Sequence, residues 1–149
     1  MRRALLFALL VFLAYGLFAQ EGFPLYGIKA GDSPETVESL FIKAGYTKNR
    51  ETVGKTSSKD FWHPEYYVLY AYSEEPDYFF ITYSFRAKVD FFECVSSMRK
   101  NLGNLYSLSD RERKAEWRIS SATGSIVIKL SQDTDDGNTS LWIDFYKNR

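Results

Sequence analysis

A stretch of alternating side chains near the C-terminus decides the fold. Residues 139–146 read TSLWIDFY, so polar and apolar positions exchange along most of the segment. From residue 141 onward, one set of alternate positions is apolar and consists of Leu141, Ile143 and Phe145. Because successive side chains of a β-strand point to opposite faces, the pattern predicts a strand with one buried face. Trp142 and Tyr146 then lie on the opposite face of that strand.

Four more stretches predict strands that belong to the same sheet. Residues 115–120 and 125–130 alternate in a similar way, and residues 66–72 and 78–85 are rich in aromatic and β-branched side chains. Residues 73–77 contain a Pro between acidic residues and predict a turn, because Pro cannot continue a strand ladder. The two aromatic-rich strands therefore form a hairpin.

Two segments predict amphipathic helices with clear starting signals. Ser33 can cap a helix over residues 34–44, and Asp90 can cap a second helix over residues 91–102. In both segments the apolar residues recur every three or four positions, which places them on one helical face. Residues 47–59 are polar and predict a loop or a short edge strand.

The order helix, strands, helix, strands is typical of the α+β class. We expect two helices packed on one face of an antiparallel sheet of about five or six strands. Residues 20–149 are long enough for a single domain with its own core. The halves 27–85 and 86–149 have the same order of elements, so two α-β-β(-β) repeats and a domain without duplication both remain open.

The N-terminal segment 1–19 has the pattern of a secretory signal peptide. Arg2 and Arg3 precede an uncharged apolar run, and Ala19 offers a cleavage site before a polar stretch. A retained membrane anchor is the alternative, although residues 4–19 cover only about 24 Å of helix against a hydrocarbon core of about 30 Å. We expect a secreted or periplasmic protein with no integral membrane span once the leader is removed.

Composition excludes several classes of function. Lys and Arg together number 19, as do Asp and Glu, so the clustered positive charge of a nucleic-acid-binding protein is not indicated. With one Cys and one His, the chain has too few ligands for most zinc sites and cannot form an internal disulfide. Cys94 falls in a helical segment and is interpreted as a buried thiol, with an intermolecular disulfide as the alternative.

No residue pattern identifies a catalytic, metal or cofactor site. His63 is the only candidate base, and no nucleophile-elbow glycines flank any Ser. Asp133, Asp135 and Asp136 suggest a calcium loop, but alignment of Gly137 with its glycine position leaves the first ligand positions without acids. That segment is therefore interpreted as a hairpin turn. We predict no catalytic residue, no metal and no cofactor.

Residues 27–40 read GIKAGDSPETVESL. This segment contains a glycine, a helix-capping Ser, and then Val and Leu on the first predicted helix. This segment resembles the opening of the β-lactamase-inhibitor-protein-like superfamily, which includes the small SmpA/OmlA outer-membrane assembly lipoproteins. The resemblance implies a small secreted α+β module that binds proteins through a sheet face and performs no chemistry.

Aromatic side chains are too many for one face of the sheet. They make up 11 of the 25 residues from position 61 to position 85. Two helices can cover only one face, so part of this set must remain on an open face. We expect that open face to bind a partner through five residues, namely Tyr78, Phe80, Trp142, Tyr146 and Tyr70.

The favoured function is non-enzymatic binding of an envelope or extracellular protein or peptide by this aromatic face. A structural envelope component, whose aromatic face is covered in a homodimer, is one alternative. A hydrolase of unrecognised type is another, and it requires a deep pocket with two acids or an acid beside His63. The residues of strand 66–72 leave open whether Tyr67 or the row with Tyr70 is exposed.

Overall fold

The computed structural model describes residues 26–73 and 77–148 of the chain. The predicted signal segment 1–19 lies outside these residues, as does most of the turn predicted at 73–77. The described elements follow in the order α2 (Pro34–Lys43), β1 (Thr47–Thr52), β2 (Thr56–Trp62), β3 (Tyr66–Ser73), β4 (Tyr78–Phe85), α3 (Phe91–Leu102), β5 (Ser107–Ser109), β6 (Lys114–Ser120), β7 (Gly124–Gln132) and β8 (Thr139–Lys147).

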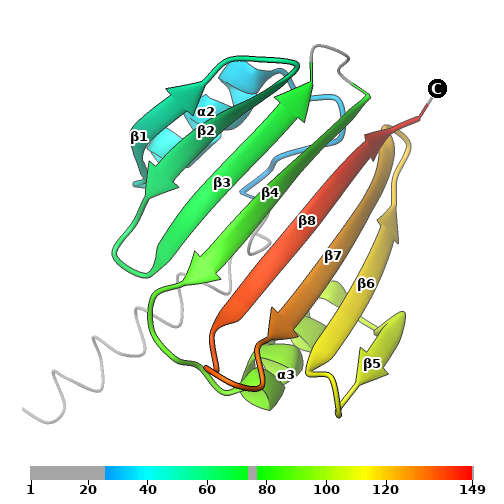
Figure 1. Ribbon diagram of the computed structural model, residues 1–149. Helices are drawn as coiled ribbons and strands as arrows, with labels where there is room; N and C mark the ends of the chain where they lie inside the picture. The colour runs from blue at the N-terminus through cyan, green and yellow to red at the C-terminus, as the bar shows by residue number, and fades with distance from the viewer. Residues whose placement is uncertain (1–25, 74–76, 149) are drawn as a thin grey trace, which may run out of the picture.

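All the strands belong to one open antiparallel sheet (Figure 1). Its eight strands lie in the order β1-β2-β3-β4-β8-β7-β6-β5. Each helix is followed by four strands that pair in sequence, and the two sets meet where β4 pairs with β8. The α+β class and the antiparallel sheet are confirmed, whereas the predicted number of five or six strands is wrong.

The strands that the sequence did not predict are those without a continuous apolar face. β1 consists of TKNRET, and all of its side chains are exposed. β2 has Ser57 and Lys59 at buried positions, and β5 has only three residues. Such strands give no hydrophobic alternation, so their segments resemble loops in the sequence.

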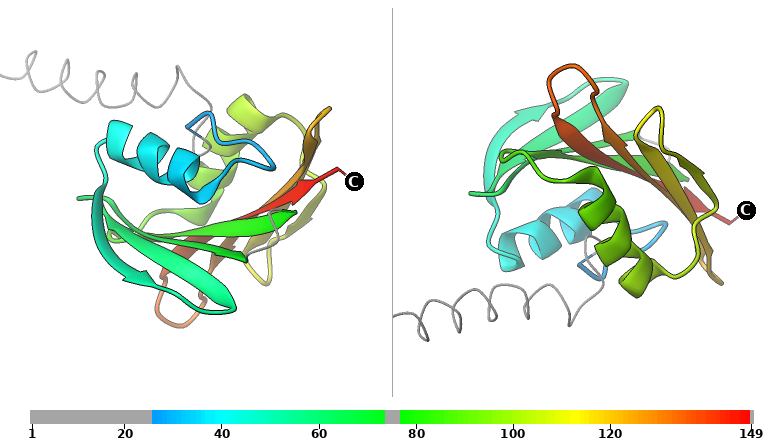
Figure 2. Two further views of the ribbon diagram at one scale, coloured as in Figure 1. Left: turned by 90° about the horizontal axis from the view of Figure 1, so that it is seen from above. Right: turned by 90° about the horizontal axis from the view of Figure 1, so that it is seen from below.

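Both helices begin at the predicted capping residues. The Ser33 side chain accepts a hydrogen bond from the Thr36 amide, and the Asp90 side chain accepts one from the Glu93 amide. The second helix has its predicted bounds, and the first ends one residue earlier than predicted, at Lys43. Figure 2 shows both helices on the same side of the sheet, together with the segment that leads into α2.

The core lies between this covered face and the two helices. Val37 and Phe41 of α2 and Phe91 of α3 are completely buried. Phe41 stacks on Phe61 of β2, with 4.8 Å between ring centroids. The fully buried side chains of the sheet come from alternate positions and include Phe61, Tyr70, Ile81, Tyr83, Trp117, Ile128, Leu130, Leu141, Ile143 and Phe145.

Candidate functional site

The candidate site lies on the face of the sheet opposite the helices. Figure 1 shows this face with the helices behind it. Alternation along β4 and β8 directs Tyr78, Phe80, Trp142 and Tyr146 to this open face, because Phe79, Ile81, Ile143 and Phe145 are buried on the other. Tyr78, Trp142 and Tyr146 are 37%, 38% and 41% exposed, and Phe80 is half-buried. We call these four residues, together with Asp144, the Trp142 cluster.

Asp144 holds the Trp142 cluster together. It points to the open face yet is only 3% exposed. Its Oδ1 atom accepts hydrogen bonds from the Tyr78 hydroxyl and the Trp142 indole N–H, each at 2.8 Å. Its Oδ2 atom accepts a hydrogen bond from Lys129 Nζ at 3.1 Å. A buried carboxylate is stable only when it is paired and hydrogen-bonded, and both conditions are met here.

The rings of the Trp142 cluster pack on one another across the β4–β8 pair. Phe80 stacks on Trp142 with a centroid distance of 4.4 Å and an angle of 17° between the rings. Tyr78 lies against Tyr146 at 5.0 Å, and the two residues are direct partners in the strand register. Burial and the hydrogen bond to Asp144 raise the pKa of the Tyr78 hydroxyl, so this group stays protonated at neutral pH.

A second exposed aromatic pair lies at the other end of the open face. Trp62 of β2 and Tyr67 of β3 are register partners and are 47% and 39% exposed. The Arg86 guanidinium lies 5.2 Å from the centre of the Trp62 ring. A hydrogen bond to Asp60 raises the pKa of Tyr67. The binding residues predicted from the sequence did not include Trp62, and whether Tyr67 or the row with Tyr70 is exposed was left open; the exposed residue is Tyr67.

Tyr70 does not belong to the open face. It is completely buried on the covered face, where its ring contacts Phe79 at 5.5 Å and Tyr72 at 4.9 Å. The expectation that Tyr70 lies with the exposed set is therefore wrong. Tyr occurs at both odd and even positions of β3, so alternation alone could not decide which row the helices cover.

Charges around the Trp142 cluster are already paired. Lys129 of β7 binds Asp144, and on β6 Arg118 Nε lies 2.6 Å from Glu116 while Lys114 Nζ lies 2.9 Å from Glu112. The Lys129 side chain remains 49% exposed. This flank of the open face therefore presents aromatic surface beside compensated charges.

The residues weighed for catalysis are engaged in structural contacts. His63 lies between the rings of Tyr46 and Tyr66, at 4.7 Å and 5.8 Å, and its Nδ1 atom accepts a hydrogen bond from the Glu65 amide. Cys94 is half-buried in α3, and burial raises the pKa of its thiol. A raised thiol pKa disfavours the thiolate that a cysteine nucleophile needs.

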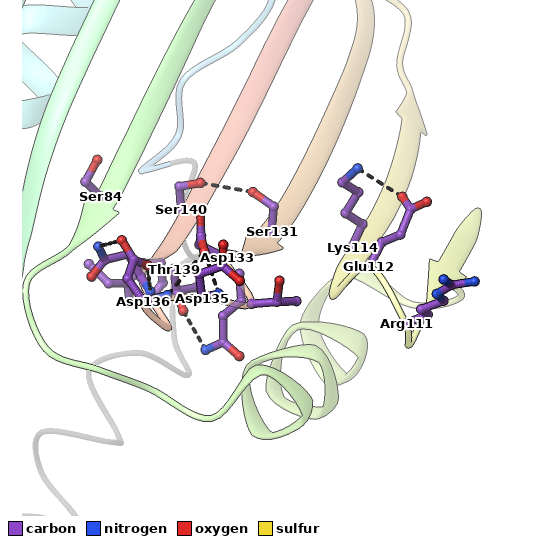
Figure 3. A pocket seen from close by; sticks show the side chains of 14 residues that line it. Ser84, Arg111, Glu112, Lys114, Ser131, Asp133, Asp135, Asp136, Thr139 and Ser140 are labelled. Atoms are coloured by element: carbon purple, nitrogen blue, oxygen red, sulfur yellow. Dashed lines mark hydrogen bonds and ion pairs between the residues drawn. The ribbon is translucent and has the colours of Figure 1, made fainter.

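An open hollow of about 890 Å³ lies at the end of β4, β7 and β8. Figure 3 shows the side chains that line it. Asp133, Asp135 and Asp136 lie in the turn before β8, as the hairpin interpretation predicts. Asp133 Oδ1 accepts hydrogen bonds from the amides of Asp135 and Asp136 at 2.7 Å and 3.2 Å, so this acid is used to shape the turn. The other two acids are exposed.

The part of the chain that the structure describes has neither a metal-binding cluster nor a helix that could cross a membrane. No group of His, Cys, Asp and Glu side chains within 26–73 and 77–148 could hold a metal ion. None of the helices in those ranges is long and apolar enough to cross a membrane.

Comparisons with family models, with curated proteins and with solved structures find no match to this chain. The function of the open face is therefore inferred from its own geometry and chemistry.

Proposed function

We propose that the protein is a non-enzymatic binding module that holds a protein partner on the open face of its sheet. The observation that carries the proposal is the Trp142 cluster, in which exposed rings are fixed around the buried carboxylate of Asp144. Large aromatic side chains with restricted rotamers supply contact area at a low cost in side-chain entropy. A fixed aromatic patch of this kind is typical of binding hot spots.

The hydrogen bonds of Asp144 prepare the surface for binding. Trp142 Nε1 and the Tyr78 hydroxyl both bind Oδ1, so both rings are oriented before a partner arrives. Phe80 stacks on Trp142 and so further restricts the orientation of the indole. Pre-organisation of this type raises affinity because less conformational freedom is lost on association.

The expected partner presents apolar side chains. The cations on β6 and β7 next to the cluster are Lys114, Arg118 and Lys129, and each already pairs with a carboxylate of this chain. A strongly charged partner would have to break these pairs, whereas an apolar one needs only to cover the rings. The signal-peptide pattern of residues 1–19 and the resemblance of residues 27–40 to small secreted binding modules support a partner in the envelope or outside the cell.

The experiment that tests this proposal is affinity capture from an envelope extract with the immobilised protein. Proteins retained by the wild type should be lost when Trp142→Ala and Tyr146→Ala are combined, since most of the exposed ring area is removed. Ile42→Ala is the matched control, because Ile42 is 53% exposed on α2 and lies away from the open face. Capture that is unchanged in the double variant, or equally reduced in the control, would overturn the proposal.

Light scattering distinguishes the proposal from self-association. A monomer at micromolar concentration leaves the open face accessible to a partner. A dimer that Trp142→Ala dissociates would instead assign the open face to a second copy of this chain. That result would replace partner binding with a structural role.

We also infer that residues 27–85 and 86–149 are two repeats of one unit. The support is that a helix followed by four strands occurs in each, and that the strand order runs inward from both edges to β4 and β8. Each unit has an open sheet edge at its last strand, and pairing of β4 with β8 covers both edges at once.

A further inference from the structure

A second surface with different chemistry lies between α3 and the end of the sheet. A hollow of about 540 Å³ separates the helix from β5 and the turn that follows it. Its lining consists of Phe92, Val95, Ser96, Arg99, Lys100, Leu108 and Asp110. The residues from α3 are spaced three or four apart, so they form one side of the helix. We call this hollow the α3 groove.

The floor of the α3 groove is apolar. Phe92 and Leu108 are each 43% exposed on opposite walls, and Val95 is buried between them. The Phe92 ring contacts the buried Phe91 at 5.3 Å, and its exposed part lines the same concave surface as the exposed Leu108. Concave apolar surface of this kind is typical of a site that takes side chains of a partner.

The rim of the α3 groove is cationic. Arg99 and Lys100 lie in the last turn of α3, and the Arg113 guanidinium lies 4.7 Å from the centre of the Phe92 ring. Within the residues that the structure describes, none of these three cations has an ion-pair partner. Asp110 is the single acid among the described lining residues. The charges of the α3 groove are therefore uncompensated, in contrast to those beside the Trp142 cluster.

We propose that the α3 groove binds an extended segment of a partner protein in which apolar side chains alternate with acidic ones. The apolar side chains contact Phe92, Val95 and Leu108, and the carboxylates pair with Arg99 and Lys100. This surface is separate from the Trp142 cluster, so the inference goes beyond the function proposed above.

The shape of the groove favours a peptide over a lipid surface. Val95 lies at the floor and is 5% exposed, so a flat bilayer surface would touch the two walls without reaching it.

Fluorescence anisotropy with labelled peptides tests this inference on the full chain. The probes are peptides of about eight residues in which Leu, Val or Phe alternate with Glu, and a matched set has Lys in place of Glu. We expect the Glu set to bind and the Lys set not to bind. Combining Arg99→Glu with Lys100→Glu should weaken binding at least about tenfold, and added salt should weaken binding to the wild type.

Control variants separate the two surfaces and the two kinds of ligand. Lys43→Glu changes the basic residue in the last turn of α2 and should leave peptide binding unchanged. Trp142→Ala should also leave it unchanged, and loss of binding in that variant would place the peptide on the open face and overturn the inference. Failure of every Glu peptide to bind would overturn it too. Binding to phosphatidylglycerol vesicles without binding to peptides would assign the groove to an anionic lipid surface instead.

Discussion

The two faces of the sheet carry similar aromatic side chains in different surroundings. On the covered face, Tyr70, Tyr83 and Trp117 have no exposed surface. This is the side of the sheet on which both α2 and α3 lie. On the open face, Trp142 and Tyr146 retain 38% and 41% of their exposure. The position of a ring relative to the helices, more than its residue type, therefore decides whether it stabilises the core or remains available to a partner.

The two faces also differ in how their indole and phenol groups are satisfied, although the Thr82 hydroxyl of the open face also has no hydrogen-bond partner among the described residues. On the covered face, the Trp117 indole N–H and the Tyr70 hydroxyl have no hydrogen-bond partner among the described residues. On the open face, the same two kinds of group, from Trp142 and Tyr78, both bind Asp144. Burial of a large ring outweighs a missing hydrogen bond, which costs about 1–3 kcal/mol. On the open face the hydrogen bonds orient the rings instead.

The largest loss of stability is expected at Trp117 of the covered face, and truncation of Trp142 on the open face provides the comparison. Trp117→Ala should lower the free energy of unfolding by about 3–5 kcal/mol, because it leaves a cavity under the helices. Trp142→Ala should cost less, about 1–2 kcal/mol, since its ring is partly exposed and the loss is limited to the stacking on Phe80 and the hydrogen bond to Asp144. Urea denaturation followed by circular dichroism measures both values. Equal losses of unfolding free energy in the two variants would show that a ring on the open face stabilises the fold as much as one on the covered face.

Trp117→Phe keeps this comparison informative if Trp117→Ala does not fold. The Phe ring fills most of the space and removes the indole N–H that has no partner among the described residues. We expect its loss of stability to lie well below that of the Ala variant.

A smaller loss of stability is expected when the Asp144 carboxylate is removed from the open face. Asp144→Ala takes away the shared acceptor of Tyr78, Trp142 and Lys129 and should lower the free energy of unfolding by about 1–3 kcal/mol. The fluorescence of Trp142 should change as well, because its ring is no longer held. Asp60→Ala is the control, since Asp60 serves Tyr67 at the edge of the same face. A loss no greater than in that control would contradict the organising role of Asp144.

The smallest effect is expected at an ion pair that crosses the covered face. Glu38 of α2 pairs with Lys59 of β2 and with Lys48 of β1, the latter at 2.9 Å. The hydrogen bonds from Lys59 and then Lys48 lower the pKa of Glu38 below its ordinary value of 4.5. The ionised form is thus favoured by folding, so this stabilisation is present above pH 4.5 and is lost as the pH falls below it.

Glu38→Gln should therefore be less stable than the wild type at neutral pH, and the difference should shrink in acid. Urea denaturation at about pH 7 and about pH 3.5 measures this change. Glu93→Gln, at an exposed position of α3, is the control for loss of one negative charge. A difference between Glu38→Gln and the wild type that stays constant with pH would rule out the ion pair as its source.

The strands and helices that could be predicted are those with one buried face. β6, β7 and β8 alternate in the sequence, and both helices begin at a capping side chain, so local patterns were sufficient. β1 has no buried side chain, and in β2 the buried Lys59 is satisfied by Glu38, a residue far away in the sequence. Nothing local distinguishes such strands from loops.

The candidate site could be predicted only in part, because alternation assigns a side chain to a face but does not show which strands are neighbours. Tyr78, Phe80, Trp142 and Tyr146 follow from alternation within β4 and β8, and the structure places them together on the open face. Trp142 and Asp144 are two residues apart on one strand, so the contact between them could have been found in the sequence. The Tyr78–Asp144 bond could not, because it depends on β4 pairing with β8.

The pairing of β4 with β8 is the single ladder in the described sheet that joins strands not adjacent along the chain. Each half can therefore form its own meander through short loops, at little entropic cost. The central ladder closes the longest loop and therefore has the largest entropic cost of closure. The Trp142 cluster combines side chains of β4 and β8, so we expect the complete binding surface only in a chain in which this ladder has formed.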